Sequence, residues 1–172
     1  MNLPVLLSRL ALVSGTMLAA LPLVGQETPL VCQVASAALQ VRAEGRAERV
    51  GDITITCQGG TPGQVGRTNL ILFLNRPITN VVSNDTLRDV TVTIDQGIGR
   101  RPSGVRAVLQ GATSLTFNGL DFTVPPSRAV QFSISGVRVD VSGNANQPVL
   151  ATLSFSGTNV LTLNLALEAT GR

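Results

Sequence analysis

Apolar and polar residues alternate along most of the chain after Gln26. In one segment Ile53, Ile55 and Cys57 occupy every second position, and threonines fill the positions between them. A period of two that is rich in Val, Ile and Thr predicts half-buried β-strands. The same alternation predicts further strands over residues 39–43, 90–94, 105–109, 120–124 and 160–169.

Three segments carry additional information. Residues 70–74 are continuously apolar, which predicts a central strand covered on both sides. Between Val130 and Val141 the apolar phase shifts by one residue at Gly136, which is typical of a β-bulge. The last strand is the most regular, because one face carries a leucine at every second position: Leu161, Leu163, Leu165 and Leu167.

Turn-forming residues separate these segments, and no convincing helical period occurs after Gln26. Short strands at this spacing predict an all-β, immunoglobulin-like antiparallel β-sandwich with about nine strands. Residues 26–172 are long enough for one such domain and are predicted to form only one.

The first 25 residues have the pattern of a secretory signal peptide. Arg9 precedes an apolar stretch over residues 10–24, which is shorter than the ~20 residues that a membrane-spanning helix needs. The alternative is a short membrane anchor. We predict that the protein is exported through a periplasm and is extracellular or on the cell surface. After the signal peptide is removed, we expect no stable membrane span.

Export changes the interpretation of the two cysteines. Cys32 and Cys57 form an even pair, and paired cysteines of exported proteins are usually oxidised to a disulfide. A redox-active pair is disfavoured because the chain has no C-x-x-C motif. The predicted disulfide would stabilise the fold by roughly 3 kcal/mol through loop closure.

The composition disfavours most catalytic and ligand-binding chemistry. Histidine is absent and all 13 basic residues are arginine, so the commonest general base and the imine-forming amine are missing. Two cysteines without histidine do not make an ordinary zinc site. The net charge is only +3, and the five Phe are the sole aromatic residues, which disfavours nucleic acid as a partner. We therefore expect no enzyme, no metal site and no cofactor.

The segment from Cys32 to Gly60 contains Gly51-Asp52-Ile53-Thr54-Ile55-Thr56-Cys57, a strand that ends in the second cysteine. It resembles the start of spore coat protein U domains and, more distantly, that of chaperone–usher pilins. Arg42 to Gly45 and Val50 to Asp52 are similar to the opening of a group of uncharacterised secreted bacterial proteins. A first strand over residues 37–43 is expected from this likeness. The resemblance implies a secreted immunoglobulin-like sandwich, and the pilins polymerise by donating a strand to a neighbour.

The expected function is therefore a structural subunit of an extracellular fibre, pilus or surface coat, assembled through strand complementation between subunits. The partners would be copies of the chain and a periplasmic chaperone or outer-membrane assembly factor. The donated strand would be the predicted last strand with its alternating leucines, which we call the leucine strand, or the segment around Leu30 to Val34. Two alternatives remain open: the leucine strand pairs inside its own domain, or the protein is a monomeric secreted module that binds a glycan or surface protein.

Overall fold

The computed structural model describes residues 28–143, 147–157, 161–163 and 167–171. All regular secondary structure in these ranges is β-strand, which confirms the all-β prediction, and no helix there is long and apolar enough to cross a membrane. Four strands have two or three residues: β2 (Glu48–Arg49), β5 (Val82–Ser83), β10 (Arg138–Val139) and β12 (Leu161–Leu163). The nine longer strands are β1 (Leu30–Ser36), β3 (Ile53–Gly59), β4 (Val65–Leu74), β6 (Thr86–Asp95), β7 (Arg100–Gly111), β8 (Ser114–Thr123), β9 (Ala129–Ser135), β11 (Val149–Ser156) and β13 (Leu167–Gly171).

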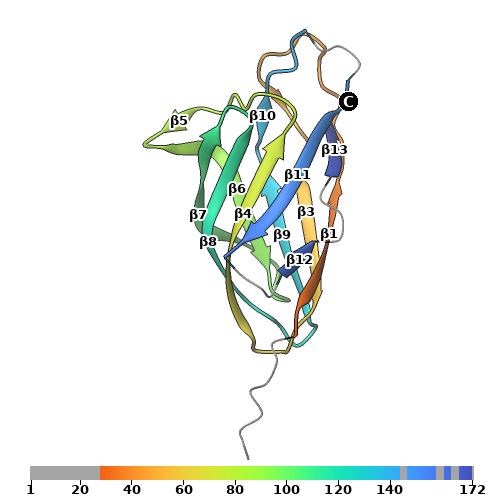
Figure 1. Ribbon diagram of the computed structural model, residues 1–172, viewed down its shortest axis with the longest axis vertical. Coiled ribbons are helices and arrows are strands. Elements are labelled where there is room, and N and C mark those ends of the chain that lie inside the picture. Colours follow the sequence, from red (N-terminus) through yellow and green to blue (C-terminus); the bar gives the residue numbers. More distant parts are fainter. Residues whose placement is uncertain (1–27, 144–146, 158–160, 164–166, 172) are drawn as a thin grey trace, which may run out of the picture.

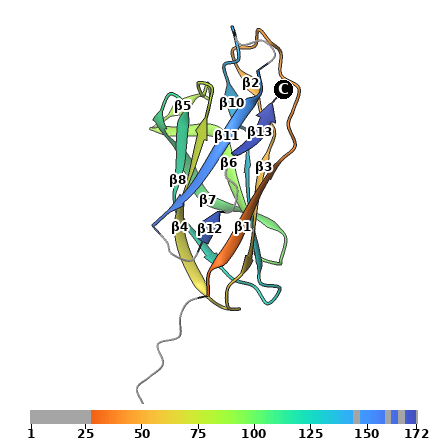
Figure 2. The same ribbon diagram turned by 45° about the vertical axis from the view of Figure 1, so that its right-hand side comes forward.

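One sheet contains most of these strands, in the order β12-β1-β3-β9-β6-β7-β8-β4-β11-β13. β7 joins the two halves of this sheet, because Arg100–Val108 pairs with β6 and Ala107–Gly111 pairs with β8. Figures 1 and 2 show the sheet folded around on itself, so that β1 at one end lies near β11 and β13 at the other. The result is an elongated, nearly closed sheet with its apolar face inside.

The core lies between the two facing halves of the sheet. The Phe132 ring on β9 contacts Phe122 on β8 edge to face, with centroids 5.8 Å apart, and contacts Phe155 on β11 at the same separation. These strands are not neighbours in the sheet, so the rings connect its opposite walls. The inward positions predicted by alternation are buried in β3, β6 and β8: Ile53, Ile55, Cys57, Val90, Val92, Ile94, Leu120 and Phe122.

One strand prediction was wrong, and a second was correct only in part. Residues 37–43 form no strand beyond a single bridge from Leu39 to Gly171, and the first strand is instead β1, whose Leu30, Cys32 and Val34 point inward. The apolar run 70–74 does lie in a central strand, β4, but it is not covered on both sides. Phe73 is 44% exposed on the outer face, because the sheet has only one apolar side.

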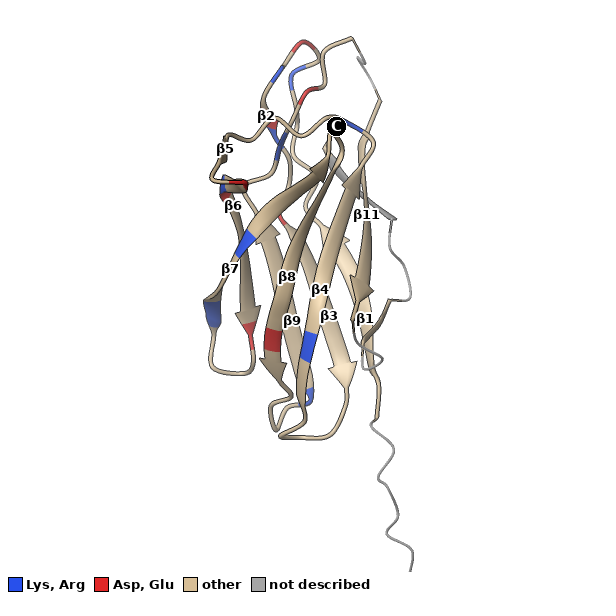
Figure 3. Ribbon diagram, turned by 60° about the vertical axis from the view of Figure 1, so that its left-hand side comes forward, with Lys and Arg blue, Asp and Glu red and all other residues tan. Residues whose placement is uncertain are grey.

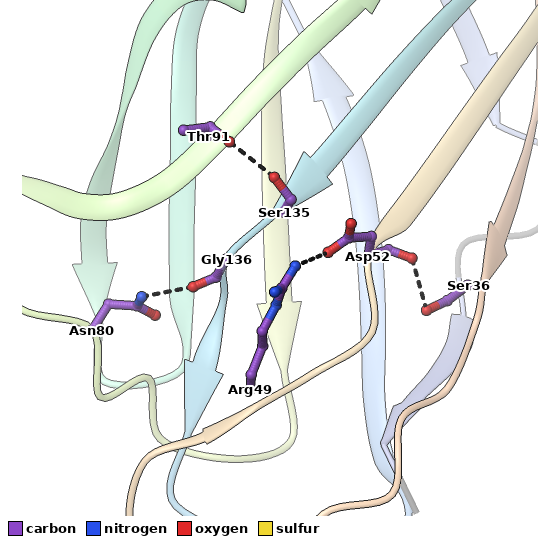
Figure 4. Close-up of polar contacts among 7 residues, drawn as sticks. All are labelled: Ser36, Arg49, Asp52, Asn80, Thr91, Ser135 and Gly136. Atoms are coloured by element: carbon purple, nitrogen blue, oxygen red, sulfur yellow. Dashed lines mark hydrogen bonds and ion pairs between the residues drawn. The ribbon is translucent and has the colours of Figure 1, made fainter.

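The phase shift at Gly136 is real, but its cause is not a bulge within one strand. β9 ends at Ser135, and the chain then leaves for the separate β10–β2 pair. Gly136 has a φ of 85°, and a Cβ there would collide with the backbone carbonyl of Asp89, so only glycine fits. The buried Asn80 side chain fixes the chain where it leaves β9. Its Nδ2 donates to the Gly136 carbonyl at 2.8 Å (Figure 4), and its Oδ1 accepts the Arg138 N–H at 2.7 Å.

Charged residues lie both in the strands and in the loops between them. Figure 3 shows several of them in the loops at the end of the molecule that carries β2 and the C-terminus, and isolated ones on β4, β6, β7 and β8. At that end Arg49 and Asp52 form an ion pair at 3.0 Å, and the Ser36 hydroxyl at the end of β1 donates to the Asp52 carbonyl (Figure 4). These contacts fix the loop that leads into β3.

Candidate functional site

The site predicted from the sequence is the C-terminal leucine segment. The structure assigns it to two strands on different neighbours rather than to one. β12 pairs in parallel with β1, and β13 pairs antiparallel with β11. Leu161 and Leu163 lie in β12, the backbone of Leu167 lies in β13, and Leu165 lies outside the described residues.

The two segments proposed as alternative donors contact each other. Leu30 of β1 is the register partner of Leu161 of β12, and both side chains are buried. The Thr162 hydroxyl adds a hydrogen bond to the Leu30 carbonyl at 3.1 Å. The sequence named both segments as donor candidates but gave no means of pairing them, because strand partners are set by tertiary structure.

The disulfide Cys32–Cys57 is confirmed and has a defined place in this site. The two cysteines are register partners on β1 and β3, and both are fully buried. Cys32 is also the register partner of Leu163 on β12. The crosslink therefore holds β1 to β3 at the level where β12 pairs with the other edge of β1. Val34 lies one inward position further along β1, 8% exposed.

β12 and β13, which we call the terminal segment, close the gap between the β1 edge and the β11 edge of the sheet. The segment starts beside Leu30, and its last described residue, Gly171, bridges to Leu39 and is the register partner of Val149 at the start of β11. A Cβ on Gly171 would lie 3.2 Å from both Val41 and Val149, so the closure is tight at this end. Gly171 was not predicted from the sequence, because a single glycine has no distinctive pattern.

Two acidic side chains, Asp95 and Asp140, accept hydrogen bonds that shape loops next to the strands. Asp95 accepts the N–H groups of Gly97 and Gly99 at 2.9 and 3.1 Å, so it shapes the β6–β7 turn. A hydrogen bond between the Ser142 and Asp140 side chains, and another from the Ser142 N–H, lower the pKa of Asp140. In the part of the chain that the structure describes, no three His, Cys, Asp or Glu residues gather in a way that could hold a metal ion.

Comparison with known proteins gives only remote structural likeness. No family model matches the chain, and no curated protein matches it. Among solved structures, the bacterial hydrophobin BslA aligns with a TM-score of 0.35 and 9% identity, over 84% of this chain and 95% of that one. AvmM, described as catalysing macrocyclization in alchivemycin A biosynthesis, aligns with a TM-score of 0.29 and 10% identity, over 81% and 89% of the two chains. Scores this low carry no argument about function.

Proposed function

We propose that this protein is a structural subunit of an extracellular fibre, pilus or surface coat, in which copies join by exchanging the terminal segment β12–β13. The observation that supports the proposal is the position of this segment. β12 pairs with β1 and β13 pairs with β11, so the two strands together fill a gap between two sheet edges. A segment with this position can occupy the same gap in a neighbouring copy.

The energetics of such an exchange are favourable for assembly. The three register pairs with β1 and the four with β11 would form equally well between two copies, so little pairing energy is lost when the segment changes partner. An opened copy would also expose unpaired N–H and C=O groups on both edges, which favours capture of a strand. The segment of each copy entering the next would generate a chain of subunits.

The disulfide has a specific part in this proposal. The β1 edge must remain in the sheet while the terminal segment is absent, since it forms one wall of the gap. A covalent bond to β3 holds β1 in register even when its other neighbour is missing. The disulfide also fits export through an oxidising compartment, which together with the signal peptide and the immunoglobulin-like sandwich is part of the proposal. A periplasmic chaperone or assembly factor would cover the gap before assembly.

Assembly can be tested with the exported protein. We expect concentration-dependent oligomers in size-exclusion chromatography with light scattering, and filaments or a coat in electron microscopy. Leu161→Asp places a charge at a buried docking position and should abolish oligomers. The control Gln33→Asp adds the same charge to an exposed position of β1 and should leave them intact. A protein that stays monomeric at every concentration, with no assemblies on native cells, would refute the proposal and favour the monomeric binding module.

A further inference from the structure

A hollow of about 340 Å³ lies on the outer face of the sheet, over β4 and β8. Asn69 and Phe73 of β4 line one side, and Ser114 and Asn118 of β8 line the other. Gln110 of β7 and Ser156 of β11 complete the rim, and Ile71 lies between the two ends. This volume is near the lower end of the ~300–1,000 Å³ that is typical of small-molecule sites.

An irregularity in strand pairing shapes one end of the hollow. The register between β4 and β8 shifts from Thr68–Leu120 to Leu70–Phe117, which leaves Asn69 opposite Asn118 and Gly119. Gly119 has a φ of 72°, and its N–H donates to Asn69 Oδ1 at 2.9 Å. Bulges of this kind are common beside functional sites, because they change the direction in which a side chain points.

Hydrogen bonds hold the polar groups at this end in place. Asn69 Nδ2 donates to the Ser156 hydroxyl at 3.4 Å, and the Thr116 hydroxyl donates to Asn118 Oδ1 at 3.2 Å. The Asn118 Nδ2 group, the Gln110 amide and the Ser114 hydroxyl make no hydrogen bond to any described residue. These three groups offer both donors and acceptors to a ligand.

The remaining surface of the hollow is apolar and uncharged. Phe73 exposes 44% of its surface, so its ring is accessible at the end away from Asn118, and Ile71 is half-buried between them. None of the lining residues is ionisable. The charges nearest along these strands, Arg67 and Asp121, form an ion pair with each other at 3.6 Å.

We propose that this hollow binds an uncharged saccharide. A sugar ring has apolar C–H faces and a rim of hydroxyl groups that both donate and accept hydrogen bonds. The exposed Phe73 ring and Ile71 match its apolar face, and the amides of Asn118 and Gln110 match its hydroxyl rim. An anionic ligand has no partner here, because no cationic side chain lines the hollow. This site does not depend on the proposed assembly, since a monomer would carry it equally.

The test uses the exported full chain and a defined set of soluble oligosaccharides. The neutral arm contains cello-, laminari-, manno- and chito-oligosaccharides of five sugars, and the acidic arm contains oligogalacturonate and a heparin fragment. Binding is measured by calorimetry, and the contact residues are mapped by NMR through the side-chain amide signals of Asn69, Gln110 and Asn118. We expect saturable binding of at least one neutral oligosaccharide, with an affinity unchanged between 50 and about 500 mM salt because the site is uncharged.

Matched substitutions locate the site. Phe73→Ala and Asn118→Ala should each weaken binding about ten-fold or more, which corresponds to about 1.4 kcal/mol. Val65→Ala, an exposed apolar residue on the same strand, and Gln58→Ala, an exposed amide on β3, should leave the affinity unchanged. The inference is wrong if no neutral oligosaccharide binds. It is also wrong if only acidic ones bind in a salt-sensitive manner, or if the two site variants bind as the controls do.

Discussion

Loss of the disulfide should weaken the fold without abolishing it. Cys32 and Cys57 are 25 positions apart, and both are fully buried. Closing a loop of this length removes unfolded-state entropy worth about 3–4 kcal/mol at room temperature. β1 and β3 share seven register pairs without help from the crosslink, so the reduced protein should still fold and keep β1 in the sheet. We therefore expect a free energy of unfolding that is lower by about 3–4 kcal/mol in the reduced protein.

The measurement is urea unfolding of the oxidised protein, the reduced protein and the Cys32→Ala/Cys57→Ala double variant. The reduced wild type isolates the crosslink, because all its side-chain atoms remain, and the double variant adds the loss of two buried sulfur atoms. Amide hydrogen exchange should become faster in β1 before it does in β3. A difference between the oxidised and reduced proteins of less than about 1 kcal/mol would refute the loop-closure argument. Two free thiols after export would refute the compartment argument.

Three further predictions concern Gly136, Asn80 and Asp140, which lie in loops next to the strands. Gly136→Ala should cost roughly 3 kcal/mol or more in urea unfolding, because a steric collision adds to left-handed strain. The control Gly99→Ala, with φ of 89° and open space around it, should cost only about 1–2 kcal/mol, and equal losses would contradict this account. Asn80→Ala removes the two part-buried hydrogen bonds to the Gly136 carbonyl and from the Arg138 N–H and should cost about 1–3 kcal/mol, whereas a loss under about 0.5 kcal/mol would argue against its clamping role. Because the pKa of Asp140 is lowered by folding, its contribution favours the folded state above the unfolded pKa and is lost as the pH falls through the folded pKa. Asp140→Asn should therefore reduce the acid dependence of the urea midpoint below about pH 4, and an unchanged profile would contradict the shift.

The all-β class and many of the inward positions follow from the sequence, because a strand buried on one face needs an apolar residue at every second position. This rule located Ile53 and Ile55 of β3 and the inward face of β6 correctly. The same rule cannot tell a strand from an extended loop, so residues 37–43 were wrongly predicted as a strand. Their alternating Leu39 and Val41 contact the end of the terminal segment instead, through Gly171.

The candidate site was predicted in its parts but not in its arrangement. Alternation identified the amphipathic character of the leucine segment, and the cysteine pair was interpreted as a disulfide from the export signal. The strand at Leu30–Ser36 was not predicted, although the segment around Leu30 to Val34 was named as a possible donor. Which strands pair is decided by contacts far apart in sequence, such as Leu30 with Leu161, and these have no local pattern. The hollow on β4 and β8 was missed for the same reason. It depends on a register shift at Asn69 and on Gly119, which the sequence presents only as an ordinary Asn-Gly turn.

The most direct test of strand exchange is crosslinking between two differently substituted copies. Thr152 of β11 and Leu167 of β13 are register partners, so a chain that carries both Thr152→Cys and Leu167→Cys should form a crosslink within itself. When a copy with Thr152→Cys alone is mixed with a copy with Leu167→Cys alone under assembly conditions, oxidation should produce a covalent dimer of the two. If the doubly substituted chain crosslinks internally but the mixture gives no mixed dimer, the terminal segment stays in its own molecule, and assembly by its exchange is contradicted.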